Sequence, residues 1–331
     1  MSKNHKILVR TPNWIGDHVM AQPFYSSLVK AYPQSEIHFL SSEALSTFDD
    51  SLFSQTKKIL PKNIKGLGAT FFLFAKELEK EKYDLALSLT SSLSSSLLLR
   101  AAKIPLRVGF AEGGSGLFFT DSIKWKGIKG NKHKSEIYLD LLNFITGKQW
   151  ALSGKKWGGK VNTETRDKRI VLAPGASIAL RVWPYFGALI SELAKTYTDY
   201  EIAIVGSFTE SYWHAEIESL KLTNVKDWIG RTSLVELIAL CRGSAVVVAN
   251  DSGVAHLAGT EAGVPTVVIF GPGDPAYIRP LGDEVYLETP IGLACHPCEK
   301  AYCHEKYGYQ ACLLSISLDK VVSRVKAILP L

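Results

Sequence analysis

No segment of this 331-residue sequence is apolar over the roughly 20 residues that a membrane-spanning helix needs. The best candidate, residues 85–102, is interrupted by Ser and Thr throughout, and residues 1–10 lack the apolar core of a signal peptide. The composition, 46% hydrophobic and 21% charged, is that of an ordinary globular protein. We therefore expect a cytoplasmic protein.

Complete fingerprints of the common nucleotide-binding loops are also missing. Residues 154–161 have the spacing of a P-loop but end in Val161, where Mg²⁺ coordination needs Ser or Thr, and no strand precedes them. Residues 66–71 contain only two of the three glycines of the dinucleotide fingerprint, again without a preceding strand. A P-loop nucleotidase and a Rossmann oxidoreductase therefore receive little support.

Cysteine is scarce, with five residues in the chain, and four of them form a C-x2-C-x4-C-x8-C pattern near the C-terminus. The pattern comprises Cys295, Cys298, Cys303 and Cys312, with His296 and His304 between them. In a cytoplasmic protein this spacing favours a metal site or thiols over disulfides. A structural zinc and metal-free thiols both remain open, because the second CxxC of the usual zinc pattern is absent. Cys241 lies in an apolar helical pattern and is expected to be a core thiol.

The length predicts two domains, and the hydrophobic pattern predicts α/β architecture in both. Short apolar runs alternate with helical periodicity on either side of a polar, Lys- and Gly-rich stretch, which indicates parallel sheets covered on both faces. We expect a domain at 1–150, a linker at 151–168, a second domain at 169–316, and a helix within 317–331 that packs back across the junction. Expected strands are 6–10, 36–40, 84–89, 170–173, 201–206, 224–228, 245–250 and 266–270; expected helices are 17–31, 184–196, 210–220, 233–241, 254–262 and 317–329.

The first half of the chain is basic and the second half is not. Residues 1–165 hold 23 basic and 14 acidic side chains (net +9), and residues 166–331 hold 15 and 18 (net −3). The densest basic patch is Lys124, Lys126, Lys129, Lys132, His133 and Lys134. It is typical of a surface for anionic lipid headgroups, a phosphorylated acceptor or nucleic acid, and equally of an ordinary solvated loop.

Three strand-end loops of the second half contain candidate phosphate- and sugar-binding groups. Residues 250–253 (NDSG) end an apolar strand at the start of a helix, where free N–H groups bind anions; Asp251 and Ser252 can equally be plain helix caps. The candidates are Ser177, Arg181, Glu210, Asp251, Ser252, Gly253 and His256. Arg181 is a cation that can neutralise a departing phosphate, and Glu210 can hold a ribose or stabilise a helix start.

Five motifs, in this order and spacing, resemble one known family over nearly the whole chain. They are PNWIGDHVMAQP (12–23), IPLRVGF (104–110), PGASIALRVWP (174–184), GSFTE (206–210) and NDSGVAHLAGTEAGVPTVVIFGP (250–272). The sequence resembles the heptosyltransferases that build the lipopolysaccharide inner core, and type II more than type I. The resemblance implies a GT-B fold, with two Rossmann-like domains and a central cleft. It also implies inverting transfer of L-glycero-D-manno-heptose from ADP-heptose to a core heptose on lipid A.

The resemblance also implies roles for individual residues. Asp17 matches the general base, which takes the proton of the attacking sugar hydroxyl; its plain alternative is a helix N-cap. Asn13, Trp14 and Gly16 are expected at the acceptor site, with residues 90–92 as a further candidate. The phosphate-binding positions are Ser177 and Arg181, with Arg where Lys is usual; Glu210 matches the ribose ligand, and Asp251, Ser252, Gly253 and His256 match the diphosphate loop.

No cofactor is implied, because the cation and the helix start supply positive charge and no Asp-x-Asp pair lies nearby. We expect the enzyme to contact the inner face of the inner membrane through residues 124–134, and no nucleic acid to bind. Two alternatives remain: a GT-B transferase or epimerase that uses another nucleotide sugar, and a basic non-catalytic module that binds nucleic acid or membrane. The sequence does not determine which core heptose accepts, the exact sugar epimer or the oligomeric state.

Overall fold

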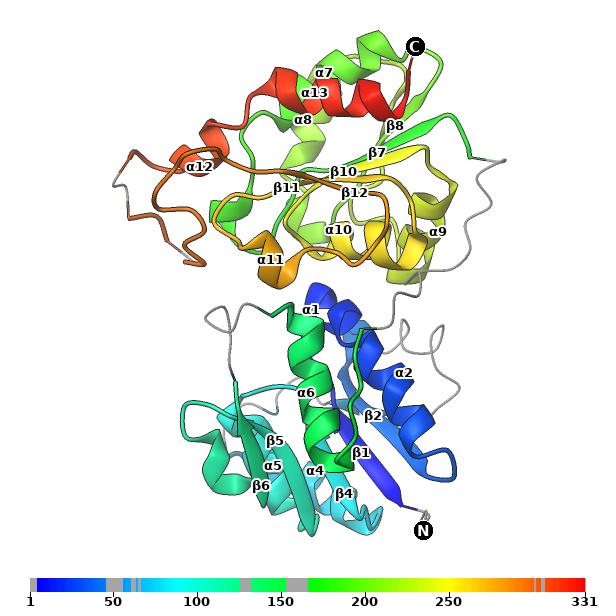
Figure 1. Ribbon diagram of the computed structural model, residues 1–331. Helices are drawn as coiled ribbons and strands as arrows, with labels where there is room; N and C mark the ends of the chain where they lie inside the picture. The colour runs from blue at the N-terminus through cyan, green and yellow to red at the C-terminus, as the bar shows by residue number, and fades with distance from the viewer. Residues whose placement is uncertain are drawn as a thin grey trace. The chain divides into compact units, whose positions relative to one another are not determined.

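The computed structural model describes residues 5–45, 56–60, 64, 67–125, 132–152, 166–300, 302–304 and 307–330. The chain forms two compact units, Met1–Gly154 and Lys155–Leu331, and each is described by itself (Figure 1). Most of the expected linker, residues 153–165, lies outside the described residues. The bounds expected for the linker and for the two domains stay a prediction.

The first unit is built on a six-stranded parallel sheet in the order β3-β2-β1-β4-β5-β6. Its strands are β1 (Lys6–Arg10), β2 (Glu36–Ser42), β3 (Thr56–Leu60), β4 (Leu85–Ser88), β5 (Leu106–Ala111) and β6 (Asp121–Lys124). Ile7 of β1 is paired with Ile37 of β2 and Leu85 of β4. Because β1 is central and covered on both faces, its sequence is an unbroken apolar run up to Arg10.

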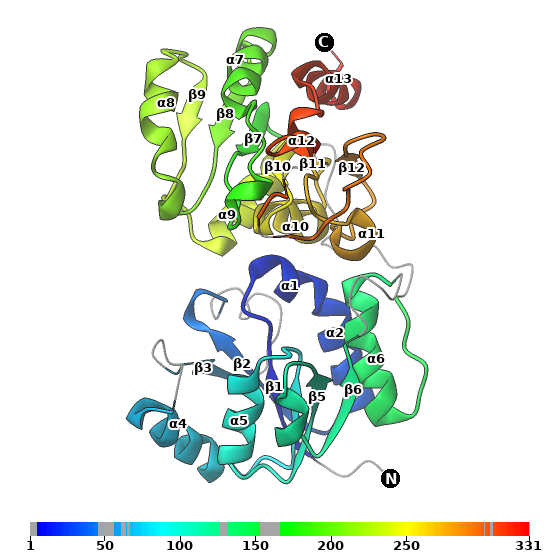
Figure 2. The same ribbon diagram turned by 90° about the vertical axis from the view of Figure 1, so that its left-hand side faces the viewer.

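Helices cover both faces of this first sheet (Figure 2). They are α1 (Ile15–Met20), α2 (Gln22–Ala31), α4 (Ala69–Lys80), α5 (Leu93–Ala101) and α6 (Lys134–Thr146), with a 3-10 turn η1 (Ser115–Phe118). Helices α2 and α6 pack together on one face, and α4 and α5 pack together on the other. The loops between β1 and α1 and between β4 and α5 are therefore left at the carboxyl edge of the sheet.

The second unit repeats the plan with the order β12-β11-β10-β7-β8-β9, again all parallel. Its strands are β7 (Arg169–Ala173), β8 (Glu201–Ile204), β9 (Val225–Asp227), β10 (Val246–Asn250), β11 (Thr266–Ile269) and β12 (Val285–Glu288). All five residues of β10 are buried. As in the first sheet, a central strand is an uninterrupted apolar run because both of its faces are covered.

The second unit's helices also lie on both faces. They are α7 (Phe186–Thr196), α8 (Trp213–Ser219), α9 (Leu234–Gly243), α10 (Gly253–His256), a π-helix η6 (Leu257–Ala262), α11 (Pro275–Ile278), α12 (Ala311–Leu314) and α13 (Leu318–Ile328), with 3-10 turns η4 (Ala179–Arg181) and η5 (Phe208–Glu210). Helices α7 and α13 pack together over one face, and α9 packs against η6 on the other (Figure 1). Trp183 is fully buried in the core under α7 and α13, where its Nε1 donates a hydrogen bond to the Ile316 carbonyl oxygen at 2.9 Å.

Several expected helices are wrong in their bounds, for local reasons. The single helix expected at 17–31 is two helices that break at Ala21, because Pro23 in the first turn of α2 cannot donate to the preceding turn. The helix expected at 210–220 is the turn η5 followed by α8, and the one expected at 254–262 is one α-helical turn followed by η6. Helix α7 begins at Phe186, two residues after Pro184.

Among the helices of the described ranges, none is both long enough and apolar enough to cross a membrane.

Candidate functional site

In each sheet the strand order reverses direction between two neighbouring strands. The reversal lies between β1 and β4 in the first sheet and between β7 and β10 in the second. At such a point the loops leaving the two strands turn to opposite faces, which leaves room for a ligand outside the carboxyl ends. The predicted site residues after β1, β7 and β10 all lie in loops or helix starts at these reversal points.

Asp17 lies in the first turn of α1, immediately after the loop that follows β1. The helix N-cap is Trp14, so the interpretation of Asp17 as a plain N-cap is wrong. Instead, the Asp17 Oδ1 atom accepts a hydrogen bond from the Lys134 Nζ atom at 2.8 Å, and 25% of the Asp17 side chain stays exposed. The structure thus places an ion-paired, solvent-accessible carboxylate at the reversal point of the first sheet.

Lys134 is the first residue of α6, and only 15% of its side chain is exposed. Its Nζ atom lies 5.7 Å from the centroid of the Trp125 ring, an arrangement typical of a cation–π contact. Lys132 also pairs internally, with both carboxylate oxygens of Asp140 at 2.8 and 2.9 Å. Two lysines of the expected basic patch therefore form ion pairs within the unit. Lys126 and Lys129 lie outside the described residues.

The expected acceptor residues form the loop between β1 and Asp17. Arg10, at the end of β1, is 2% exposed and donates from Nη2 to the Asn13 Oδ1 atom at 2.6 Å. Burial lowers the pKa of Arg10 to about 10. Asn13 is exposed, Trp14 is 64% exposed, and Gly16 lies within α1 next to Asp17. Arg10 was not among the predicted site residues. A lone charge at the end of an apolar strand is a sequence signal for a buried charge that positions a neighbouring side chain.

The second candidate acceptor loop, residues 90–92, follows β4 at the same reversal point. The Ser88 hydroxyl donates to the Thr90 carbonyl oxygen at 2.9 Å, which shapes the turn out of the strand. Ser92 is the N-cap of α5, but its side chain makes no capping hydrogen bond. This loop therefore shares the sheet edge from which the loop carrying Asp17 leaves.

Asn250, the last residue of β10, joins the two loops at the reversal point of the second sheet. It is fully buried; its Nδ2 atom donates to the Pro174 carbonyl oxygen at 2.7 Å, and its Oδ1 atom accepts from the Trp183 backbone N–H at 3.0 Å. This side chain connects the NDSG loop to the loop after β7. The NDSG motif was predicted as part of the site, but the connecting role of Asn250 was not.

Arg181 lies in η4 and is oriented by carboxylates from two other loops. Its Nη1 atom is 2.8 Å from the Asp251 Oδ2 atom, and its Nη2 atom is 3.7 Å from the Glu299 Oε2 atom. Asp251 is 3% exposed and Glu299 is 14% exposed, whereas 21% of the Arg181 side chain is accessible. The guanidinium has five donors in a fixed plane, so it can bind a phosphate oxygen while it stays paired with Asp251.

The remaining predicted donor residues lie around this pair. Ser252 is the N-cap of α10 but makes no side-chain capping bond, and its buried hydroxyl has no hydrogen-bond partner within the described residues. Ser252 is therefore the N-cap by position, as its plain alternative expects, but its side chain makes no capping bond. Gly253 begins α10, and His256 ends it, 4% exposed. Ser177 is exposed in the loop after β7.

Glu210 ends the turn η5 after β8 and lies against the loop after β7. Its carboxylate accepts hydrogen bonds from the Ser207 backbone N–H at 2.7 Å and from the Ser207 hydroxyl. A Cβ atom on Gly175 would lie only 2.4 Å from the Glu210 Cγ atom, so Gly175 allows this close approach. Glu210 therefore closes a capping box on η5, which fits its plain alternative, and it lies against Gly175 in the loop after β7. Its role as a ribose ligand stays a prediction.

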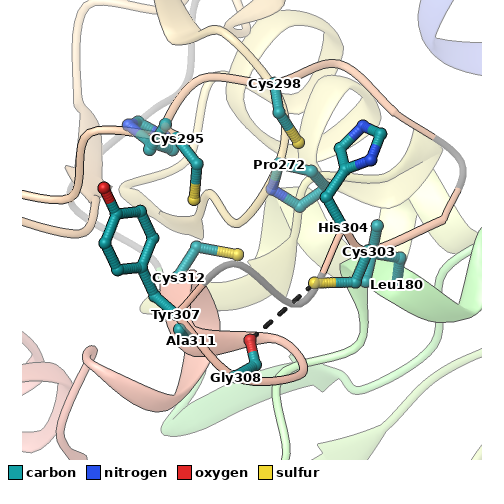
Figure 3. A pocket seen from close by; sticks show the side chains of 11 residues that line it. Leu180, Pro272, Cys295, Cys298, Cys303, His304, Tyr307, Gly308, Ala311 and Cys312 are labelled. Carbon is teal, nitrogen blue, oxygen red and sulfur yellow. Dashed lines mark hydrogen bonds between the residues drawn. The ribbon is translucent and has the colours of Figure 1, made fainter.

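The four C-terminal cysteines line one pocket (Figure 3). The lining residues are Leu180, Pro272, Cys295, His296, Cys298, Cys303, His304, Tyr307, Gly308, Ala311 and Cys312. The structure shows these cysteines as thiols, and within the described residues no three His, Cys, Asp or Glu side chains already form a metal-coordinating group. Burial, and to a smaller extent the other three cysteines, raise the pKa of Cys312. Cys241 is fully buried as expected, and burial raises its pKa to about 12.

Two parallel sheets of Rossmann-type strand order, with polar site residues at the reversal point of each, are the architecture of the GT-B fold. The family model described as glycosyltransferase family 9 (heptosyltransferase) matches residues 71–308, so the chain belongs to that family. The predictions of α/β architecture, a GT-B fold and this family are confirmed.

Curated relatives and solved structures match over almost the full chain. Lipopolysaccharide heptosyltransferase 2 of Escherichia coli is 27% identical over 98% of this chain and 98% of its own length. Lipooligosaccharide heptosyltransferase 2 of Campylobacter jejuni is also 27% identical, over 97% and 98%. The structure of E. coli ADP-heptose LPS heptosyltransferase II aligns with a TM-score of 0.76 at 23% sequence identity and covers 98% of both chains. The structure of E. coli heptosyltransferase WaaC with ADP aligns with a TM-score of 0.73 at 16% identity and covers 98% of this chain and 99% of its own.

Proposed function

We propose that this enzyme transfers L-glycero-D-manno-heptose from ADP-heptose to an inner-core heptose of lipopolysaccharide, with inversion at the anomeric carbon. The observation that carries the proposal is the Asp17 carboxylate, ion-paired yet accessible, at the reversal point of the first sheet. Full-length similarity to relatives named lipopolysaccharide and lipooligosaccharide heptosyltransferase 2 supports the choice of donor sugar and acceptor.

In the proposed reaction, Asp17 takes the proton of the acceptor hydroxyl as the hydroxyl oxygen forms its bond to the anomeric carbon. The bond from that carbon to the donor diphosphate breaks on the opposite side, and its electron pair leaves with ADP. Lys134 holds the carboxylate in place through Oδ1. Asn13, Trp14, Gly16 and residues 90–92 are proposed to contact the acceptor.

The leaving ADP is proposed to be stabilised by the second unit. Arg181 offers guanidinium N–H groups, Ser177 and Ser252 offer hydroxyls, and the backbone N–H groups at Gly253 lie at a helix start. Glu210 is proposed to bind the ribose through the part of its carboxylate not used by Ser207. Asp251 acts by orienting Arg181, to which it is paired at 2.8 Å, and His256 completes the diphosphate loop.

The test of the catalytic base is the isosteric change Asp17→Asn. We expect turnover of ADP-heptose to fall by roughly 10²–10⁴, which is the usual contribution of a general base, while the affinity for ADP stays within twofold. Asp140→Asn is the matched control, because Asp140 is also a partly exposed carboxylate of the first unit paired with a lysine. Unchanged turnover in Asp17→Asn would contradict the assignment of the base.

The donor nucleotide is tested by calorimetric binding of ADP, UDP and GDP to the wild type and to Arg181→Ala. Selective ADP binding that weakens in the variant supports the proposal. Tighter UDP or GDP binding would favour the alternative, a GT-B transferase or epimerase for another nucleotide sugar; product analysis separates these, because an epimerase needs no acceptor. Absence of nucleotide binding would favour a non-catalytic basic module.

We also propose that the enzyme works in the cytoplasm, in peripheral contact with the inner membrane where its lipid-linked acceptor resides. The support is the net positive charge of residues 1–165 and the exposed Lys124. Because Lys132 and Lys134 are paired with carboxylates, we expect Lys124→Glu, rather than changes at those two, to weaken binding to vesicles that contain anionic lipid.

A further inference from the structure

We propose that Cys295, Cys298, Cys303 and Cys312 bind one thiophilic metal ion, Zn²⁺ being the best fit, and that this ion stabilises the loop beside the candidate donor site. The proposal does not depend on the identity of the donor sugar. It rests on where the four side chains lie, on the loop that carries them, and on the contacts of that loop with Arg181.

The four cysteine side chains converge on one pocket. The four cysteines come from an irregular loop and from α12, yet all line the same pocket, and their sulfur atoms point toward a common space (Figure 3). Cys298 and Cys312 are half-buried rather than at the surface, and Cys303 places its Sγ atom 3.9 Å from the Gly308 carbonyl oxygen. Four cysteine sulfurs are the donor set of structural zinc sites, and Zn²⁺ prefers them in a tetrahedron.

The same pocket contains a buried imidazole nitrogen. The His296 side chain also lines it, and its Nε2 atom is buried without a hydrogen-bond partner within the described residues. A buried imidazole nitrogen without a protein partner calls for an explanation, and a group bound in this pocket would provide one.

The loop that carries the cysteines is long and irregular. Between β12, which ends at Glu288, and α12, which begins at Ala311, no helix or strand occurs in the described residues. Irregular loops of this length are uncommon in a compact domain unless they are functional or held in place. Glu299 and Gln310 adopt left-handed backbone conformations, with φ of 51° and 53°, which are unfavourable for residues other than Gly. A metal ion would add the constraint that helices and strands do not supply here.

The loop is coupled to the candidate donor site. The Cys298 and Glu299 backbone N–H groups both donate to the Pro272 carbonyl oxygen, at 3.1 and 2.9 Å. Glu299 lies 3.7 Å from Arg181, and the Gln310 Nε2 atom donates to the Ala179 carbonyl oxygen in η4 at 3.2 Å. Because these contacts hold the turn that carries Arg181, ordering the loop orders the guanidinium.

In this conformation the described sulfur atoms do not form a coordination shell. Metal binding therefore requires the cysteine side chains to change rotamer so that their sulfur atoms approach one another. Each bound thiol would lose its proton to solvent, because Zn²⁺ binds the thiolate. No oxidation or reduction is involved. The ion is expected to be structural, with four protein ligands and no position left for substrate.

The test uses the full-length protein, purified without chelator and without a histidine tag. Elemental analysis is expected to find about one zinc per chain; one iron per chain would support the same thiolate site. The variants Cys298→Ser and Cys312→Ser should each lose the metal, whereas Cys241→Ala, the buried control cysteine, should keep it. His296→Asn should also keep it, because four thiolates complete the tetrahedron.

A second measurement remains valid if a serine variant fails to fold. The wild-type protein is stripped of metal and titrated with Co²⁺, which gives thiolate charge-transfer and tetrahedral d–d absorption bands when bound by four cysteines. We expect these bands to saturate at one equivalent. Absence of both stoichiometric metal and the Co²⁺ spectrum would overturn the proposal, and so would retention of the metal in both serine variants. Neither outcome bears on Asp17 or on the donor nucleotide.

Discussion

At the scale of single residues, the candidate site consists of charged groups held by partners from distant segments. Asp17 is paired with Lys134, and Arg181 with Asp251 and Glu299. None of the three charged partners is exposed by more than 15%. Partial burial strengthens such pairs and fixes their geometry, so each partner is expected to act on the reaction through the group that it positions.

Lys134 is expected to be a positioning residue for the base. In Lys134→Met, Asp17 loses its 2.8 Å ion pair, and we expect kcat to fall about tenfold, by roughly the 1.4 kcal/mol that corresponds to one decade, with little change in the KM for the donor. Lys134→Arg should restore most of the activity, because it restores a cation. Equal losses in Met and Arg variants would indicate that Lys134 serves only to fold α6.

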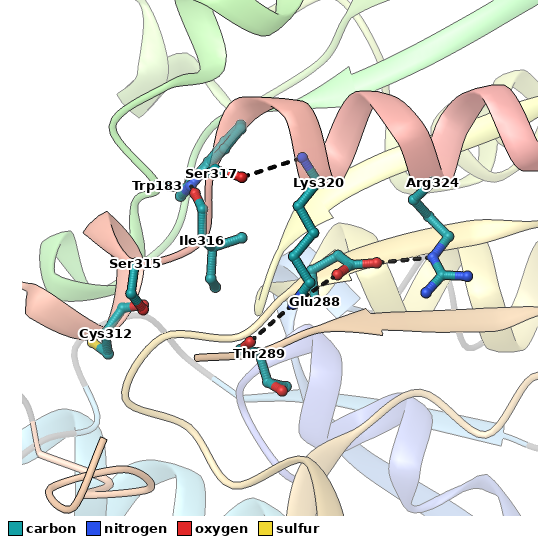
Figure 4. A network of polar contacts seen from close by, with 9 residues as sticks. All are labelled: Trp183, Glu288, Thr289, Cys312, Ser315, Ile316, Ser317, Lys320 and Arg324. Atoms are coloured by element: carbon teal, nitrogen blue, oxygen red, sulfur yellow. Dashed lines mark hydrogen bonds and ion pairs between the residues drawn. The ribbon is translucent and has the colours of Figure 1, made fainter. Parts of the chain in front are cut away.

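At the scale of elements, the C-terminal helix is held to the second sheet by a buried carboxylate (Figure 4). Glu288, the last residue of β12, is 1% exposed; its Oε1 atom lies 2.8 Å from the Arg324 Nε atom and its Oε2 atom 3.1 Å from the Lys320 Nζ atom. Both cations project from α13, whose apolar face contributes Val321 and Val325 to the core. Packing and ion pairing therefore hold α13 in the same position.

We expect the two sides of this network to respond unequally to mutation. Removing both cations, in Lys320→Ala with Arg324→Ala, leaves a buried carboxylate unpaired and should cost about 3–5 kcal/mol in the free energy of unfolding. Glu288→Gln leaves two cations that can reach solvent and should cost about 1–3 kcal/mol. Urea unfolding measures both, with the exposed Lys326→Ala as control. A greater loss in Glu288→Gln would contradict this account of the network.

His38 on β2 makes the first unit sensitive to acid. It is 2% exposed; its Nδ1 atom is 2.8 Å from the Tyr83 hydroxyl and its Nε2 atom is 2.6 Å from Glu36. Burial lowers the pKa of His38, and the pull of Glu36 in the opposite direction is the smaller effect. The folded state therefore binds the His38 proton less readily than the unfolded state does.

The sign of the effect follows from that difference. Stability from neutral His38 is fully present above the unfolded-state pKa of about 6.5. It is lost as the pH falls from that value to the lower folded-state pKa, with a slope of at most about 1.4 kcal/mol per pH unit. We expect His38→Gln to flatten the decrease in the free energy of unfolding between about pH 7 and 5. Denaturant unfolding of the wild type and the variant at a series of pH values measures this.

At the scale of the whole molecule, the two units carry separate sets of functional groups. The proposed base and acceptor loops belong to the first unit, and the proposed nucleotide and sugar-phosphate groups belong to the second. Each unit has its own apolar core beneath its sheet. The proposed reaction therefore divides into acceptor activation by one unit and donor binding by the other.

This division predicts distinct kinetic signatures. Asp17→Asn should lower kcat with the ADP dissociation constant unchanged, whereas Asp251→Asn, which removes the charge that orients Arg181, should raise that constant by about tenfold or more, as expected for loss of a buried charge pair. The free-energy effects of the two changes should add in the double variant, because Asp17 is paired within the first unit and Asp251 within the second. Calorimetry and steady-state kinetics together measure this, and a large coupling energy would contradict the division.

The α/β class, the two Rossmann-like halves and the strand-end positions of the site residues could be predicted from the sequence alone. These features are local: an apolar run predicts a buried strand, and a polar loop after it predicts the edge where ligands bind. Helix bounds near Pro23 and in the run 254–262 were less accurate, because a broken helix and a π-helix keep nearly the same hydrophobic period.

Which side chains contact one another depends on the tertiary structure. Asp17 and Lys134 are 117 positions apart in the chain, and nothing in either local pattern distinguishes that lysine from its neighbours in the basic stretch. The same holds for Arg181 with Glu299, and for the four cysteines that share one pocket. Local sequence encodes burial and backbone conformation, whereas contacts between distant segments depend on strand order and on the direction in which each helix crosses its sheet.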